Sequence, residues 1–341
     1  MKNIDWKSLP FGYLKTDYNV RSTFKKGKWS ELEISDSEYV SVHMAATGLH
    51  YGQEAFEGLK AFKGKDGKVR LFRWRDNFLR LQNSADGILM KRVPEDLFYN
   101  AIITAIKKNA KYIPPYGSAA SLYIRPILFG SGPKVGVSPS DEYTFIVFVT
   151  PVGPYFKNGF NPVNMLISRE FDRVAPKGTG SLKVGGNYAS GLRAMEKAHS
   201  GNFASVLFLD SKEKKYIDEC GPANFFAIKN NTYITPKSDS ILPSITNKSL
   251  CELAISEGMK VERRQVLASE LSTFDEVGAC GTAAVISPIK KIVEDETGKV
   301  YEYCKDGKPG PISFKLYTKL QAIQYGEIPD NFGWTEIVDI L

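Results

Sequence analysis

The chain has 341 residues, more than one ordinary core accommodates, so we expect two domains. A content of 43% hydrophobic and 24% charged residues is typical of a globular protein and excludes a disordered or low-complexity chain. The net charge is +7, but the sequence contains no run of five basic residues. This distribution favours a basic surface that attracts anionic metabolites over a nucleic-acid interface.

The first half of the chain predicts short strands, two helices and two longer strands. In chain order these are β-prone runs over residues 10–40, an aromatic and glycine-rich stretch over 49–62, a strand over 69–73, helices over 76–90 and 95–110, and strands over 121–129 and 142–150. Asp76 or Asn77 is placed to cap the first helix.

The strand over 121–129 contains Tyr123 and Arg125, whose side chains share one face because they are two residues apart. A tyrosine and an arginine on one face suit an anion site. The alternative is an edge strand with its polar face in water, which Pro126 also fits. The Gly/Pro-rich residues 130–139 that follow are expected to form a lid or an interface loop.

The second half mixes strands and helices, which indicates an α/β or α+β domain. Residues 151–162 are rich in Gly and Pro and form the best candidate linker between domains at 1–150 and 163–341. Strands are expected at 163–169, 204–209, 214–218, 223–228, 232–235, 260–266, 276–280 and 284–292, and helices at 188–199, 246–258 and 312–325.

Cysteine and histidine spacing argues against several chemistries. The four cysteines include no C-x-x-C pair, and their scatter indicates a reducing compartment. The three histidines are not spaced as a metal pair, so we expect no metal site. The N-terminus lacks the apolar core of a signal peptide, and no apolar run approaches the ~20 residues of a membrane span. We expect a cytoplasmic protein that does not bind membranes.

Residues 178–191 form the stretch with the clearest chemistry. Five of these fourteen residues are glycine, and Lys183 stands between Leu182 and Val184. A lysine among apolar neighbours can lose its proton and act as an amine nucleophile. The alternative is a surface loop with one exposed lysine.

Three further residues have chemical groups that could act on the same cofactor as Lys183. Glu219 lies at a strand end, where a carboxylate could hold a proton on a heterocyclic nitrogen. Ser244 is placed to cap the predicted helix over 246–258, whose N-terminus suits a phosphate. Thr282 follows a strand in a Gly-Thr-Ala-Ala turn and supplies a hydroxyl. An amine, a carboxylate and a phosphate site are together what pyridoxal 5'-phosphate requires.

These residues also resemble a known family. In their order and spacing, residues 51–62, Tyr-Ile-Arg-Pro at 123–126, Lys-Val-Gly-Gly-Asn-Tyr at 183–188, Glu219 with Asn224, and Gly-Thr-Ala at 281–283 are similar to the branched-chain-amino-acid aminotransferases, which are fold-type IV enzymes. The resemblance extends from Phe11 to the C-terminus. It implies two α/β domains, a smaller N-terminal and a larger C-terminal one, with the cofactor in the cleft between them.

The resemblance implies a role for each matching position. Lys183 would bind the cofactor covalently and move a proton, Tyr188 would bond the ring hydroxyl, and Glu219 would pair with the pyridine nitrogen. The phosphate would be bound by Arg80, Ile245, Thr246 and Thr282. The substrate would be bound by Tyr51, Phe56, Tyr123, Arg125, Tyr155, Ala283 and Ala284, together with Val137 of a partner subunit.

The expected reaction is transfer of the amino group of leucine, isoleucine or valine to 2-oxoglutarate, in a homodimer or an assembly of dimers. Arg125 would receive the γ-carboxylate of glutamate in a pocket that also accepts aliphatic side chains. A D-amino-acid aminotransferase or aminodeoxychorismate lyase of the same fold is the alternative. Ser244 and Asn247 replace the glycine and the basic residue found in many members, which predicts a less positive phosphate site.

Overall fold

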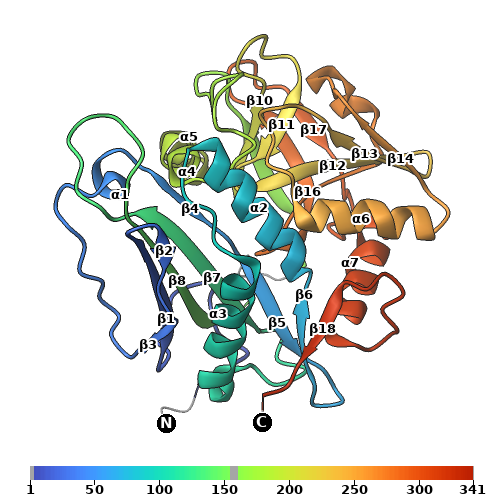
Figure 1. The fold of residues 1–341 in the computed structure, drawn as a ribbon. Helices are drawn as coiled ribbons and strands as arrows, with labels where there is room; N and C mark the ends of the chain where they lie inside the picture. The colour runs from blue at the N-terminus through green and yellow to red at the C-terminus, as the bar shows by residue number, and fades with distance from the viewer. Residues whose placement is uncertain (1–3, 154–159, 341) are drawn as a thin grey trace. The chain divides into compact units, whose positions relative to one another are not determined.

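The structure is a computed structural model that describes residues 4–153 and 160–340. These residues form two compact units (Figure 1). Unit 1 comprises Met1–Lys157, Leu182–Gly185 and Ala322–Leu341, and unit 2 comprises Asn158–Ser181 and Gly186–Gln321. Both units mix strands and helices, as expected for the α+β class.

The two units differ in two segments from the domains expected on either side of residues 151–162. Leu182–Gly185 lies in unit 1, and so does the C-terminal segment, because β18 (Thr335–Val338) pairs antiparallel with β6 (Val69–Phe72). The expected C-terminal domain over 163–341 therefore lacks these two pieces. Residues 154–159 of the expected linker lie outside the described residues, and the linker itself stays a prediction.

Unit 1 contains a nine-stranded sheet among its described residues, in the order β18-β6-β5-β7-β8-β1-β2, with β3 paired to β1 and β4 to β7. The remaining strands are β1 (Asn19–Lys25), β2 (Lys28–Trp29), β3 (Glu33–Ser35), β4 (Glu54–Phe56), β5 (Leu59–Lys63), β7 (Ser121–Gly130) and β8 (Tyr143–Val152). The helices are α1 (Thr47–His50), α2 (Trp74–Gly87), α3 (Glu95–Lys108) and η1 (Ala110–Tyr112).

Strand β7 is an interior strand, so the edge-strand alternative is wrong. It pairs with β8 on one side and with β4 and β5 on the other. Pro126 lies opposite the break between β4 and β5, so it is paired with no residue of either strand on that side. Its carbonyl accepts the N–H of Glu57 at 2.8 Å.

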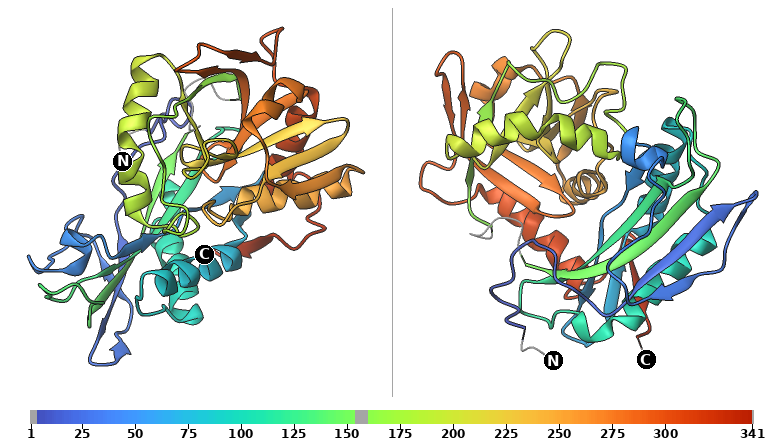
Figure 2. Two further views of the ribbon diagram at one scale, coloured as in Figure 1. Left: turned by 90° about the horizontal axis from the view of Figure 1, so that it is seen from above. Right: turned by 90° about the vertical axis from the view of Figure 1, so that its left-hand side faces the viewer.

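Helices α2 and α3 pack against this sheet (Figure 2). Their apolar faces, including Leu81, Phe98 and Ile102, are completely buried in the core of unit 1. The prediction of a cap at Asp76 or Asn77 is wrong, because α2 begins at Trp74 after Arg73, which adopts a left-handed conformation with φ of 49°. Asp76 instead pairs with the guanidinium of Arg73 at 2.6 Å within the first turn.

Unit 2 is built on a second nine-stranded sheet among its described residues, in the order β11-β10-β9-β16-β15-β12-β13-β14, with β17 paired to β16. An additional pairing of β11 with β12 closes part of this sheet into a ring. The strands are β9 (Val163–Ile167), β10 (Ser205–Leu209), β11 (Ile217–Cys220), β12 (Ala223–Lys229), β13 (Thr232–Pro236), β14 (Lys260–Arg264), β15 (Glu276–Gly281), β16 (Val285–Glu294) and β17 (Val300–Glu302).

The remaining helices are α4 (Gly185–Ser190), α5 (Leu192–Ser200), α6 (Ile245–Ser256), η2 (Ala268–Thr273) and α7 (Pro311–Tyr325). The single helix predicted over 188–199 is thus two helices, which meet at Gly191. The predicted cap of α6 is confirmed, because the hydroxyl of Ser244 accepts the N–H of Asn247 at 3.1 Å. In the described part of the chain, no helix combines the length and apolarity needed to cross a membrane.

Candidate active site

The segment around Lys183 lies beside β4 in unit 1 and is bonded on both edges. The carbonyl of Lys183 accepts the N–H of Phe56 at 3.1 Å, and Val184 forms an isolated antiparallel bridge with Ala55. On the other edge, the N–H of Lys183 donates to the hydroxyl of Ser84 on α2 at 2.9 Å. The backbone at Lys183 is therefore fixed by main-chain and side-chain bonds.

The two apolar neighbours of Lys183 pack into the core of unit 1. Val184 is 4% exposed, and Leu182 packs against the same cluster. Gly87 ends helix α2 where a Cβ would lie 2.3 Å from a methyl group of Leu182, so a larger residue there would displace the Leu182 side chain. The alternative of a surface loop with a stray lysine is wrong.

The amine of Lys183 lies in a setting that disfavours its charge. Its Nζ is 4.7 Å from the ring centroid of Phe56. Burial and, next, the positive charge of Arg80 lower the pKa of Lys183 to about 8, while Glu57 acts in the opposite direction. A neutral amine, the nucleophilic form, is thus accessible near neutral pH.

Arg80, the predicted phosphate ligand of unit 1, is held by Glu57. Its Nε and Nη2 lie 2.8 and 2.9 Å from the two carboxylate oxygens in a bidentate pair. Both residues are buried, Glu57 completely. Such a pair fixes the plane of the guanidinium and keeps a charge near Lys183.

Tyr123 and Arg125 share one face of β7, as predicted. An Nη2–H of Arg125 donates to the hydroxyl of Tyr123 at 3.1 Å, and the guanidinium lies 4.8 Å from the ring centroid of Phe56. The Nε of Arg125 is buried and bonds to no described residue. Lys183 and Arg125 therefore both contact Phe56, and the predicted residues Phe56, Arg80, Tyr123, Arg125 and Lys183 form one positively charged cluster in unit 1.

Tyr51 and Val137 lie in exposed loops of unit 1. The hydroxyl of Tyr51 donates to the carbonyl of Val135, and Val137 is 87% exposed. A side chain that exposed fits the expected role toward a partner subunit, which stays a prediction. Tyr155, the remaining expected pocket residue, lies outside the described residues.

Glu219, on β11 of unit 2, is 3% exposed and firmly positioned. One carboxylate oxygen accepts the N–H of Leu242 at 2.5 Å, and the same oxygen lies 3.4 Å from the guanidinium of Arg173. Arg173 also donates to the carbonyls of Gly180 and Ser240. Glu219 is therefore buried, whereas an isolated glutamate is usually exposed to solvent.

Asn247 lies in a buried polar network at the start of α6. Its side chain bonds the hydroxyl of Tyr233 at 2.8 Å, the hydroxyl of Thr235 at 2.7 Å and the amide oxygen of Asn224 at 3.1 Å. Asn224 in turn donates to the carbonyl of Leu242 at 3.1 Å. The asparagine that replaces a basic residue therefore connects the helix N-terminus with the segment that holds Glu219.

The other residues predicted for unit 2 occupy helix starts and a turn. Ile245 and Thr246 are buried in the first turn of α6, and Tyr188 is half-buried in α4. Residues 282–284, which are Thr282, Ala283 and Ala284, form the turn between β15 and β16. Backbone N–H groups in tight turns and in the first turn of a helix are of the kind that bind anions.

Sequence patterns missed four residues that support these positions: Glu54, Glu57, Ser84 and Arg173. The two glutamates had a signal, because Glu54 and Glu57 flank two apolar residues within the stretch over 49–62 that was already singled out. No local sequence pattern pointed to Ser84 or Arg173. Their partners are 99 and 46 residues away in the chain, respectively.

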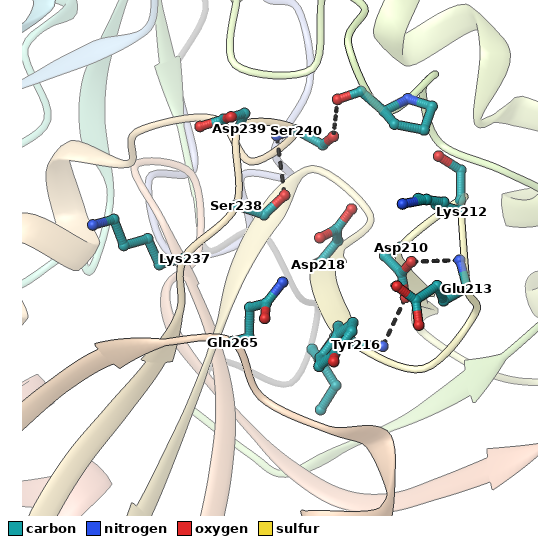
Figure 3. Close-up of a pocket in the computed structure, with 13 residues that line it drawn as sticks. Asp210, Lys212, Glu213, Tyr216, Asp218, Lys237, Ser238, Asp239, Ser240 and Gln265 are labelled. Atoms are coloured by element: carbon teal, nitrogen blue, oxygen red, sulfur yellow. Dashed lines mark hydrogen bonds between the residues drawn. The ribbon is translucent and has the colours of Figure 1, made fainter.

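Unit 2 also contains a polar pocket of about 460 Å³ beside β11 (Figure 3). Asp218, the neighbour of Glu219, lines it with Asp210 and Ser238. Burial raises the pKa of Asp218 to about 6, and the charge of Arg173 partly opposes that rise. In residues 4–153 and 160–340, no group of three or more His, Cys, Asp or Glu side chains could hold a metal ion.

Comparison with known proteins gives the family of the chain. The family model described as "Amino-transferase class IV" matches residues 54–292, which is more than half of the sequence. The chain belongs to the class IV aminotransferases.

Individual class IV aminotransferases are similar over nearly the whole chain. The branched-chain-amino-acid aminotransferase of Haemophilus influenzae is 46% identical over 341 aligned residues, which cover 98% of both chains. The crystal structure of the Escherichia coli branched-chain amino acid aminotransferase superimposes with a TM-score of 0.80 at 28% identity, covering 95% of this chain and all of that one. The enzyme from Thermobaculum terrenum, in its PLP-form, gives 0.79 at 25% identity, covering 95% and 99%.

Proposed function

We propose that this class IV aminotransferase transfers the amino group of leucine, isoleucine and valine to 2-oxoglutarate. The observation that most supports the proposal is the buried amine of Lys183, which is fixed on both backbone edges and has a pKa lowered to about 8. The relatives named as branched-chain enzymes match the chain from end to end. They favour this reaction over those of the D-amino-acid aminotransferases and aminodeoxychorismate lyases.

The residues fit pyridoxal 5'-phosphate, the cofactor that the Thermobaculum terrenum enzyme contains. Lys183 offers an amine with a lowered pKa for its aldehyde, and the carboxylate of Glu219 is buried, held by the N–H of Leu242, and would pair with its pyridine nitrogen. Arg80, Thr282 and the N–H groups at Ile245 and Thr246 would bind its phosphate, and Tyr188 its ring hydroxyl. When bound, this cofactor withdraws electrons from the substrate Cα and so allows its proton to leave.

The protein's own groups then bind substrate and move protons. The amine of Lys183, whose pKa is lowered to about 8, would accept the proton from Cα in its neutral form and return it. Tyr123 and the backbone at Ala283 and Ala284 would bind the α-carboxylate. Phe56 offers an apolar wall for the leucine side chain, and we expect Tyr51, Tyr155 and, from a partner subunit, Val137 to complete it.

Arg125 gives the same pocket a place for a second carboxylate. Its guanidinium bonds the hydroxyl of Tyr123 and lies over Phe56, while its Nε has no partner among the described residues. A buried donor without a partner favours an incoming acceptor. We propose that it binds the γ-carboxylate of glutamate and 2-oxoglutarate. We also propose that the protein acts in the cytoplasm as a homodimer or an assembly of dimers.

Steady-state transamination across amino donors tests this function. With 2-oxoglutarate as acceptor, L-leucine, L-isoleucine and L-valine should be converted with ping-pong kinetics, and D-alanine should not. Preferential use of D-alanine would overturn the proposal in favour of a D-amino-acid enzyme.

A further inference from the structure

Glu54 belongs to the same face of the unit 1 sheet as the proposed substrate residues. In the antiparallel pairing of β4 with β7, Glu54 lies opposite Phe129 and Phe56 lies opposite Ile127. Directly opposed residues project to the same face, and so do residues two apart on one strand. The side chains of Glu54, Phe56, Arg125 and Tyr123 therefore line one surface.

The carboxylate of Glu54 also holds the chain just after Lys183. One of its oxygens accepts the N–H of Gly185. A Cβ on Gly185 would lie 2.0 Å from that oxygen, so only glycine permits the approach. The bond adds a third fixed point to the Lys183 backbone, after those made by Phe56 and Ser84.

Glu54 and Arg125 interact electrostatically without direct pairing. Burial raises the pKa of Glu54, while the Gly185 bond and the charge of Arg125 act to lower it. Nevertheless, Arg125 forms no ion pair with any carboxylate of the described residues, and its Nε stays without a partner. The negative charge is thus close enough to act on the guanidinium but leaves its N–H donors available.

We propose that Glu54 is a positioning and specificity-determining residue: it holds Gly185 beside Lys183, and its charge limits how tightly Arg125 binds a substrate carboxylate. The proposal rests on the proposed function of Arg125. A pocket for both leucine and glutamate needs such a balance. An uncompensated arginine would be costly beside an aliphatic side chain, whereas a directly paired one would not bind the second carboxylate.

Two substitutions separate the two roles of Glu54. Glu54→Gln removes the charge but keeps an oxygen that accepts the Gly185 N–H. Glu54→Ala removes both. Glu142→Gln is the matched control, because it removes one negative charge from a half-buried carboxylate of the same unit that pairs with Lys25.

Calorimetric binding to the holoenzyme provides the readout, with glutarate as the dicarboxylate probe and 4-methylvalerate as the aliphatic probe. Since a repelling charge is removed, Glu54→Gln should bind glutarate roughly three- to tenfold more tightly and change 4-methylvalerate affinity by less than about twofold. The KM for 2-oxoglutarate should fall in parallel at nearly unchanged kcat. Glu54→Ala should lower kcat with every donor, and Glu142→Gln should match the wild type.

An unchanged glutarate affinity in Glu54→Gln, or an equal shift for both probes, would overturn the proposal. A kcat in Glu54→Ala equal to that of the wild type would refute the positioning role. Wild-type holoenzyme that transaminates no branched-chain donor would refute the proposed function instead. The ratio of the two binding constants would still report on Glu54 in that case.

Discussion

The guanidinium of Arg173 lies 3.4 Å from the carboxylate of Glu219, and both side chains are buried in unit 2. A buried carboxylate without a cation would take up a proton or destabilise the fold. Arg173 therefore supplies the positive charge that this buried carboxylate requires, and we propose that Glu219 in turn pairs with the pyridine nitrogen of the cofactor. The same guanidinium donates to the carbonyls of Gly180 and Ser240, so it also ties the glycine-rich loop to the segment before α6.

Replacing Arg173 with Met should destabilise the apoprotein by about 3–5 kcal/mol, because it leaves Glu219 buried without a cation. Urea denaturation measures this change. The affinity for pyridoxal 5'-phosphate should fall as well, since a protonated Glu219 no longer offers a charge to the pyridine nitrogen. Arg173→Lys keeps a cation and should recover part of both losses. A Met variant with wild-type stability and cofactor affinity would show that the pair has no such role.

Asn247→Leu should cost about 2–5 kcal/mol of unfolding free energy, because the partners of the lost amide are left buried without bonds. Those partners are Tyr233, Thr235 and Asn224. Lys248→Ala, at the exposed neighbouring position of α6, is the matched control and should change stability by less than about 0.5 kcal/mol. Equal stabilities for the two variants would contradict a structural role of the network.

Stability of the apoprotein should depend on pH through Lys183. Its pKa is about 8 in the folded state against 10.5 for the free side chain. The unfolded chain therefore binds more protons between these values, and folding stability rises with pH across that window. Relative to wild type, Lys183→Met should be more stable by about 2–3 kcal/mol at pH 7, and this advantage should vanish near pH 10.5.

Denaturation of both apoproteins across this pH range measures the difference. Lys60, a buried lysine of unit 1, has a pKa lowered to about 7 by burial and contributes equally to both proteins. An advantage of Lys183→Met that stays constant from pH 7 to pH 10.5 would mean that the Lys183 amine is not desolvated.

Much of this site could be predicted from local sequence. Leu182 and Val184 flank the lysine with apolar side chains, and both pack on the core as that pattern implies. Ser244 caps α6 because a serine before a helical run has a local physical role. Tyr123 and Arg125 share a face because strand geometry requires it.

Features that depend on distant partners could not be predicted. Strand β18 pairs with β6 across more than 260 residues, and nothing near Thr335 specifies that partner. The strand predicted at 214–218 begins only at Ile217. Asp210 accepts the N–H groups of Glu213, Lys215 and Tyr216 and so closes a turn there. A turn held by a side chain several residues earlier overrides local strand propensity.

The central claim is that Lys183 is the amine that binds the cofactor, and covalent trapping tests it most directly. Borohydride reduction of the holoenzyme, followed by protease digestion and mass spectrometry, identifies the modified lysine. Lys60 provides an internal comparison, since it is also a buried amine of unit 1 with a lowered pKa. We predict a phosphopyridoxyl group on Lys183 alone; modification of Lys60 or any other lysine, with Lys183 unmodified, would contradict the assignment.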